Sequence, residues 1–200
     1  MAEWVGILLA AGSGRRFDPS GKRLKLLQLL PDGTPIAVAS ARALLGAMPR
    51  VLAMVPADDS ANTLQLSALL TKAGCVVLPC PASKGGMGNT VAAAIAASAD
   101  TAGWLLLPAD MPWLTADSCQ RVLAALQDGH MTAAPVCAGQ RGHPVGFSAG
   151  CRDALLAVQG EQGARSVLLQ YPPTLVDVVD HGVLLDVDGP DDLAQHPARS

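Results

Sequence analysis

The sequence of 200 amino acids has few aromatic side chains and no excess of basic charge. Aromatic residues make up 3% of the chain while half of it is apolar, so a core must be built mainly from Ala, Val and Leu. The formal net charge is −3. Proteins that follow the phosphates of a nucleic acid normally carry a basic face. We therefore expect no nucleic-acid partner.

Long apolar runs and paired cysteine motifs are also missing. No stretch reaches the roughly 18 apolar residues that span a membrane, and residues 1–4 lack the basic segment of a signal peptide. The five cysteines form no Cys-x-x-Cys pair and no Cys/His spacing typical of zinc. We therefore predict free, buried thiols in a soluble cytoplasmic protein that has no membrane partner. The five are Cys75, Cys80, Cys119, Cys137 and Cys151.

The first 130 residues alternate short apolar runs with segments of helical period. This alternation is typical of a parallel, doubly wound α/β sheet. Thr34 is expected to cap the first helix, with Pro35 as its first helical residue. The predicted strands are 5–11, 51–55, 76–78 and 104–107, and the predicted helices are 34–48, 60–72, 87–98 and 115–127.

The pattern changes after Met131. Two strands joined by a hairpin-like loop are expected over 132–136 and 145–148, and two more over 175–179 and 183–187. Short helices are expected near 150–158, 163–170 and 190–195. The length fits one core, and no linker or repeat interrupts it. We predict a single α/β domain over residues 1–200, with one mostly parallel, mixed sheet and helices on both faces.

A glycine-rich turn follows the first predicted strand. Its backbone N–H groups, at the carboxyl edge of the sheet, are placed to bind phosphates, and Arg15 and Arg16 would add charge-assisted bonds. Phe17 stands where a dinucleotide fingerprint has glycine, and no Gly-Lys-Ser/Thr follows. The alternative is a plain strand-to-loop turn. Lys25 would supply a further cation, although Lys22 is also close by.

Three carboxylates suggest a metal site. Asp110 directly follows the strand predicted to be buried on both faces, so it should lie in the crevice where doubly wound sheets bind ligands. Carboxylate oxygens suit Mg²⁺, which also takes phosphate and water ligands. Asp186 and Asp188 alternate on the last predicted strand, so only one of them could join Asp110. The alternatives are a turn or cap role for Asp110 and a helix cap for Asp188.

Taken together, six segments resemble the MobA-like, glycosyltransferase-A-type nucleotidyltransferases, and most closely the molybdenum cofactor cytidylyltransferases. The similarity covers nearly the whole chain. The sequence departs from the pattern by a longer stretch before Lys25, by Ala109 in place of glycine, and by Gly14 where serine is common. The six segments begin at Leu9, Gly85, Pro108, Arg141, Gly160 and Asp186.

The resemblance implies an Mg²⁺-dependent transfer of CMP from CTP to the molybdenum cofactor, with release of pyrophosphate. Residues 1–114 would bind the nucleotide and 115–200 the acceptor, and the resemblance also implies transient contact with a molybdoenzyme. Ala11 favours CTP, because guanylyl-transferring relatives tend to carry glycine there. The implied roles are catalysis by Arg16, Lys25 and Asp110; metal binding by Asp110 and Asp188; acceptor binding by His143 and Arg165; and nucleotide binding by Ala10, Ala11, Gly12, Ser13, Gly14, Arg15, Lys25, Gly86, Met87, Gly88 and Asn89.

Other functions remain open on the sequence. Another NTP, or a sugar or alditol phosphate as acceptor, would use the same chemistry. An NAD-dependent oxidoreductase is a further class, but this sequence lacks the third glycine of the dinucleotide fingerprint. A non-catalytic cofactor-loading module would not need Arg16 and Asp110.

Overall fold

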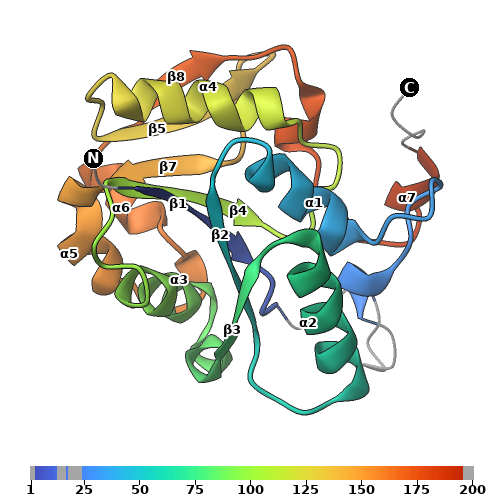
Figure 1. Ribbon diagram of the computed structural model, residues 1–200. Coiled ribbons are helices and arrows are strands. Elements are labelled where there is room, and N and C mark those ends of the chain that lie inside the picture. The colour runs from blue at the N-terminus through green and yellow to red at the C-terminus, as the bar shows by residue number, and fades with distance from the viewer. Residues whose placement is uncertain (1–2, 13–16, 18–23, 196–200) are drawn as a thin grey trace.

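The computed structural model describes residues 3–12, 17 and 24–195, and it contains one mixed β-sheet with helices on both faces (Figure 1). Four parallel strands lie in the order β3-β2-β1-β4. Beyond β4 the sheet continues with antiparallel β7, then β5, which also pairs with β6 and, in parallel, with β8. The strands are β1 (Trp4–Leu9), β2 (Arg50–Pro56), β3 (Val76–Cys80), β4 (Gly103–Pro108), β5 (Thr132–Cys137), β6 (Gln140–Arg141), β7 (Val145–Ser148) and β8 (Thr174–Asp177).

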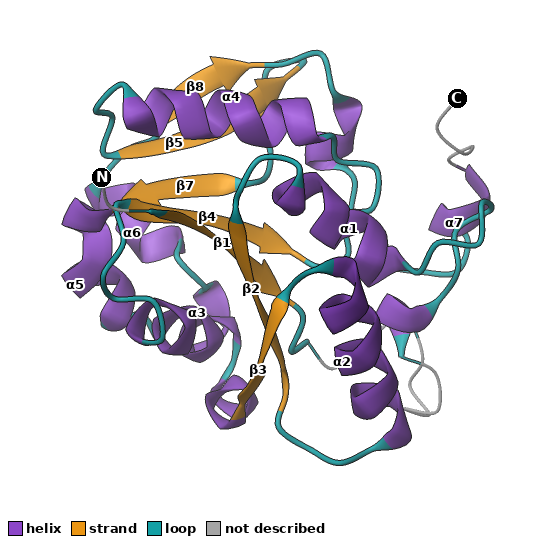
Figure 2. Ribbon diagram, in the orientation of Figure 1, coloured by secondary structure: helices purple, strands orange, loops and turns teal. Residues whose placement is uncertain are grey.

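The predicted doubly wound α/β fold is confirmed by the way the helices divide between the two faces of the sheet (Figure 2). On one face lie α1 (Ile36–Leu45), α2 (Ala61–Ala73) and α4 (Ala116–Gln127). The other face is covered by α3 (Met87–Ala96), α5 (Arg152–Leu156) and α6 (Arg165–Gln170). The short elements are α7 (Asp192–Gln195) and the 3₁₀ helices η1 (Lys25–Leu27), η2 (Pro81–Gly85), η3 (Ala149–Cys151), η4 (Gly160–Gln162) and η5 (His181–Leu184).

The central strands are apolar on both sides, and their side chains divide between two cores. In β4, Leu105 and Leu107 belong to the core under α1, α2 and α4, while Trp104 and Leu106 belong to the core under α3, α5 and α6. This follows from the two-residue period of a strand. A continuous apolar run is therefore what a strand buried on both faces requires. All five cysteines are buried free thiols, as predicted.

Helix starts agree with the sequence in two cases and are shifted in a third. Ser60 caps α2 by accepting the Thr63 N–H at 3.2 Å, and Thr115 caps α4 by accepting the Ser118 N–H at 3.4 Å. Pro35 is extended, with φ −63° and ψ 141°, and is itself the N-cap of α1, so the prediction of Pro35 as the first helical residue is wrong by one position. In the described residues no helix is long and apolar enough to cross a membrane.

The strand predicted at 183–187 is wrong. His181–Leu184 form η5, and residues 185–188 follow in no strand. The edge of β5 is taken by β8, so this segment does not pair with β5. Asp180 instead fixes it against the start of α4, because its Oδ2 accepts the Thr115 N–H at 2.8 Å and its Oδ1 accepts the Gly182 N–H at 2.9 Å.

Candidate active site

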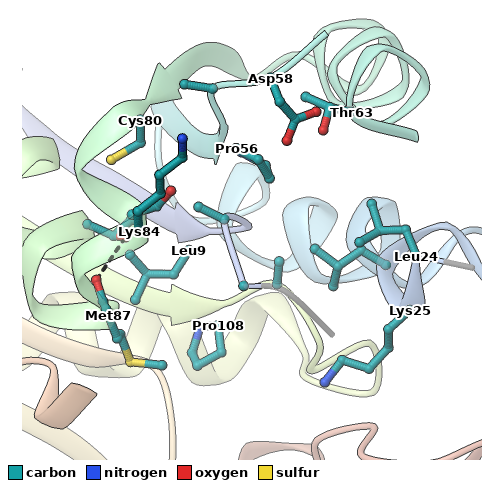
Figure 3. A pocket seen from close by; sticks show the side chains of 18 of the residues that line it. Leu9, Leu24, Lys25, Pro56, Asp58, Thr63, Cys80, Lys84, Met87 and Pro108 are labelled. Atoms are coloured by element: carbon teal, nitrogen blue, oxygen red, sulfur yellow. Dashed lines mark hydrogen bonds between the residues drawn. The ribbon is translucent and has the colours of Figure 1, made fainter. Parts of the chain in front are cut away.

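A cavity of about 780 Å³ opens at the carboxyl edge of the four parallel strands (Figure 3). The last residue of each strand lines it, as the topology of an open parallel sheet leads one to expect. Its volume is in the range of small-molecule sites. These four strand-end residues are Leu9, Pro56, Cys80 and Pro108.

Lys25 and Asp110 form an ion pair in this cavity. Lys25 Nζ donates to Asp110 Oδ2 at 2.6 Å, and the two side chains are only 12% and 21% exposed. The other carboxylate oxygen, Asp110 Oδ1, is buried and has no hydrogen-bond partner among the described residues. Buried polar atoms are normally paired in proteins. The site therefore has an anionic oxygen without a partner in the described residues. This oxygen could coordinate a metal ion or accept a hydrogen bond from a bound ligand.

The glycine-rich turn reaches the same cavity at its start. Ala11 and Gly12 line the cavity, whereas Ala10 is buried and donates its N–H to Met54 O at 2.9 Å. A Cβ added to Gly12 would meet no atom of the described residues within 4 Å, and the φ of Gly12 is not in the left-handed region. Protein packing thus gives no reason for glycine here. The predicted residues Ser13, Gly14, Arg15, Arg16 and Lys22 lie outside the described residues.

The Gly-Met-Gly-Asn segment starts α3 and lies only partly in the cavity. Gly86 and Met87 line it, but Gly88 and Asn89 do not. A Cβ on Gly86 would lie 2.6 Å from Gly160 C, and one on Gly88 would lie 2.7 Å from Gln159 C. Asn89 Oδ1 accepts the Gly160 N–H at 2.9 Å. Gly86, Gly88 and Asn89 therefore contact the backbone of residues 159–160.

The two late carboxylates come near Asp110 through the backbone. Val187 N donates to Asp110 O at 2.9 Å. Partial burial raises the pKa of the Asp186 carboxyl, and the negative charges of Asp110 and Asp188 raise it further. Asp192 Oδ2 accepts the Asp188 N–H at 2.8 Å. Neither Asp186 nor Asp188 lines the cavity, and in the described part of the chain no three His, Cys, Asp or Glu residues form a ready metal cluster.

The two predicted acceptor residues lie in different settings. His143 is half-buried and its Nδ1 has no partner among the described residues. Burial lowers the pKa of His143 to about 4, although the negative charge of Asp110 opposes this shift. His143 and Asp110 are thus electrostatically coupled. Arg165 is exposed at the start of α6 and does not line the cavity.

Sequence reasoning missed several polar residues of the cavity. Asp58 follows the end of β2 and Lys84 follows the end of β3, so the rule that ligands bind at the carboxyl edge could have found both. Thr90 enters from the first turns of α3. Glu161 comes from a distant part of the chain, and within the segment that begins at Gly160 only Arg165 had been given a role.

Similar proteins were found in both sequence and structure. Nicotine blue oxidoreductase of Paenarthrobacter nicotinovorans is 31% identical over 183 residues, which cover 88% of this chain and 86% of that protein. Rv0371c from Mycobacterium tuberculosis H37Rv superimposes with a TM-score of 0.78 at 20% identity, over 97% of both chains. Its complex with manganese gives a TM-score of 0.72 at 21% identity, again over 97% of both chains.

A nucleotidyl transferase from Methanothermobacter thermautotroptrophicus has a TM-score of 0.77 at 17% identity, over 96% of this chain and 95% of that one. At such identities these structures show a shared fold. The family model for the MobA-like NTP transferase domain matches residues 6–175, which is most of the chain. With the sheet-edge cavity and its Lys25–Asp110 pair in view, this match means that the chain belongs to the family of MobA-like NTP transferase domains.

Proposed function

We propose that the chain is a divalent-metal-dependent nucleotidyltransferase that moves CMP from CTP to the molybdenum cofactor and releases pyrophosphate. The observation that carries this proposal is the Asp110 carboxylate. One oxygen pairs with Lys25, and the other is buried without a partner among the described residues, beside a cavity large enough for a nucleotide. Membership of an NTP transferase family supports the reaction class.

The residues present fit a magnesium ion. Asp110 Oδ1 is a hard oxygen donor without a partner in the described residues. Mg²⁺ is usually held by one or two carboxylates together with substrate phosphates and water, so it does not need a three-residue cluster, and the described residues contain none. Asp110 would hold the ion. Asp188 is the proposed second ligand, and its neighbour Asp186, whose carboxyl is electrostatically coupled to Asp110, is the alternative.

The residues of the cavity have separate tasks in this mechanism. The ion, when bound, supplies charge stabilisation on the phosphate oxygens. Lys25, with Arg16 as the second proposed cation, stabilises the charge that builds on the leaving pyrophosphate. Gly12 has no side chain, which lets the phosphates approach the backbone N–H groups. The nucleophile is the acceptor phosphate, which is already ionised, so positioning replaces a general base.

The proposed choice of substrates rests on Ala11, His143 and Arg165. Ala11 lines the cavity at the position where guanylyl-transferring relatives tend to carry glycine, and this favours CTP over GTP. His143, near Asp110, is the proposed contact with the acceptor. Arg165 would have to meet the acceptor outside the cavity. GTP or another NTP, and a sugar or alditol phosphate, are the alternatives.

A second candidate function is an oxidoreductase activity, which the 31% identity to nicotine blue oxidoreductase favours. Against it, Phe17 is buried in the core at the position where a dinucleotide fingerprint requires glycine.

One experiment separates the candidates. The protein is incubated with each of the four NTPs, Mg²⁺ and either molybdenum cofactor, a sugar 1-phosphate or an alditol phosphate, and pyrophosphate release is measured. In parallel, oxidation of NADH and NADPH is followed by absorbance with nicotine blue as the electron acceptor, the compound in the name of the similar oxidoreductase. The proposal expects release that requires both CTP and the molybdenum cofactor. Pyrophosphate release with another NTP or another acceptor would assign different substrates to the same reaction. Nicotinamide oxidation without pyrophosphate release would overturn the proposed nucleotidyl transfer.

A further inference from the structure

One wall of the cavity comes from the second half of the chain. Residues 159–161 lie against the start of α3, where Gly86, at φ +105°, and Gly88 leave no room for a Cβ beside Gly160 and Gln159. Gly163, just after this segment, packs against Met87, since a Cβ on Gly163 would lie 3.1 Å from Met87 Sδ. This close approach brings Glu161 into the cavity.

Of the three carboxylates that line the cavity, only Glu161 is without a polar partner among the described residues. Asp110 pairs with Lys25 at 2.6 Å. Asp58 Oδ1 accepts the Ser60 N–H at 3.0 Å. Glu161 has neither a hydrogen bond nor an ion pair within the described part of the chain. Its carboxylate is therefore free to accept hydrogen bonds from a ligand.

The position of Glu161 restricts which part of a nucleotide it can meet. Met87, against which its segment is packed, and Lys25 lie on opposite sides of the cavity (Figure 3). If the phosphates lie at Gly12, Lys25 and Asp110, the nucleoside points toward Met87 and Glu161. An unpaired carboxylate repels phosphate, so Glu161 suits the uncharged nucleoside part of the nucleotide, which carries hydrogen-bond donors. The vicinal 2′- and 3′-hydroxyls of a ribose match the two oxygens of one carboxylate.

We propose that Glu161 accepts hydrogen bonds from the ribose hydroxyls of the bound NTP and thereby selects ribonucleotides over deoxyribonucleotides, with Asn89 as the positioning residue that holds its segment. This inference rests on the proposed function. It also gives Asn89 a role different from direct contact with the nucleotide, because its Oδ1 is engaged by the Gly160 N–H.

The test compares the affinity of the protein for CTP, 2′-deoxy-CTP and 3′-deoxy-CTP by calorimetry with Mg²⁺. The wild type should bind CTP about tenfold or more tightly than either deoxy analogue, the scale of a lost hydrogen bond to a charged group. Glu161→Gln should weaken CTP binding, leave the deoxy analogues nearly unchanged, and so reduce the preference to within about threefold. Asp153→Asn, an exposed carboxylate of α5 outside the cavity, is the matched control and should keep the wild-type preference.

Two Asn89 variants test the positioning role. Asn89→Asp keeps an oxygen that can accept the Gly160 N–H, so it should retain the ribose preference, whereas Asn89→Ala should lose it. If the side-chain NH₂ of Asn89 contacted the nucleotide instead, both variants would weaken CTP and the deoxy analogues alike. Thermal unfolding of each variant shows that it is folded.

The possible failures are distinguishable. The ribose assignment is overturned if the wild type shows no ribose preference, if Glu161→Gln keeps it, or if that variant changes only the KM for the acceptor. If none of the four NTPs binds to the wild type, the proposed function fails, and this inference falls with it.

Discussion

Removing either partner of the Lys25–Asp110 ion pair should destabilise the free protein even without substrate. The pair joins η1 to the end of β4 across 85 residues of sequence. Lys25→Met removes the cation and leaves both oxygens of Asp110 without a partner in the described structure. Asp110→Asn is milder, because the amide oxygen can still accept a hydrogen bond from Lys25 Nζ.

The burial of the pair sets the expected magnitude. Exposed ion pairs contribute about 0.2–1 kcal/mol, whereas breaking a buried pair costs about 3–5 kcal/mol. With side chains 12% and 21% exposed, this pair lies between these limits and nearer to the buried one. We expect Lys25→Met to lower the free energy of unfolding by about 2–3 kcal/mol and Asp110→Asn by about 1–2 kcal/mol. The double variant should lose about 1–2 kcal/mol less than the sum of the two.

The assay is urea unfolding of the wild type, both single variants and the double variant, in buffer without divalent metal. Lys72→Met, at an exposed position in the last turn of α2, is the control and should change the free energy by less than about 0.5 kcal/mol. If the losses of the single variants simply add, the two side chains do not interact in solution. The reasoning that makes Asp110 a half-satisfied carboxylate would then be refuted.

Two other predictions concern His143 and the glycines. In the folded protein burial lowers the pKa of His143 from 6.5 to about 4, so folding disfavours its protonation, and stability present above about pH 6.5 is lost as the pH falls toward 4. When the pH is lowered from about 7 to 5, the free energy of unfolding should therefore fall by about 1–2 kcal/mol less in His143→Gln than in the wild type. Equal decreases in the two proteins would contradict this. Gly88→Ala should cost about 1–3 kcal/mol, because its Cβ would lie 2.7 Å from Gln159 C. Gly12→Ala should keep stability while weakening NTP binding in calorimetry, since its Cβ would meet no atom of the described residues within 4 Å. A wild-type NTP affinity would contradict the phosphate role of the turn.

The central sheet and one end of the site could be predicted because they depend on local patterns. The apolar run of β4 has to be buried on both faces, which places Asp110 at the carboxyl edge whatever its distant partners are. Lys25 was one of several cations after the turn, and only the three-dimensional structure pairs it with Asp110.

The parts that could not be predicted depend on contacts between distant segments. Residues 183–187 have the composition of a strand, but β8 already covers the edge of β5, and Asp180 holds the segment against α4. Glu161 reaches the cavity only because Gly86 and Gly88 admit its backbone. Gly86 and Gly88 were predicted to bind the nucleotide, and the structure shows that they also admit the backbone of residues 159–160, which Asn89 holds through its bond to Gly160, 71 residues along the chain.

The measurement that tests the central claim most directly is the rate of pyrophosphate release from CTP and the molybdenum cofactor, at saturating Mg²⁺, for the wild type and Asp110→Asn. The substitution keeps the shape of the side chain and removes the charge that would hold the ion. If Asp110 holds the metal that stabilises the transferring phosphate, turnover should fall by about two orders of magnitude or more. Asp186→Asn and Asp188→Asn, measured alongside, should show which neighbour shares the ion by the larger loss. Near-normal turnover in Asp110→Asn would contradict the metal assignment and the mechanism built on it.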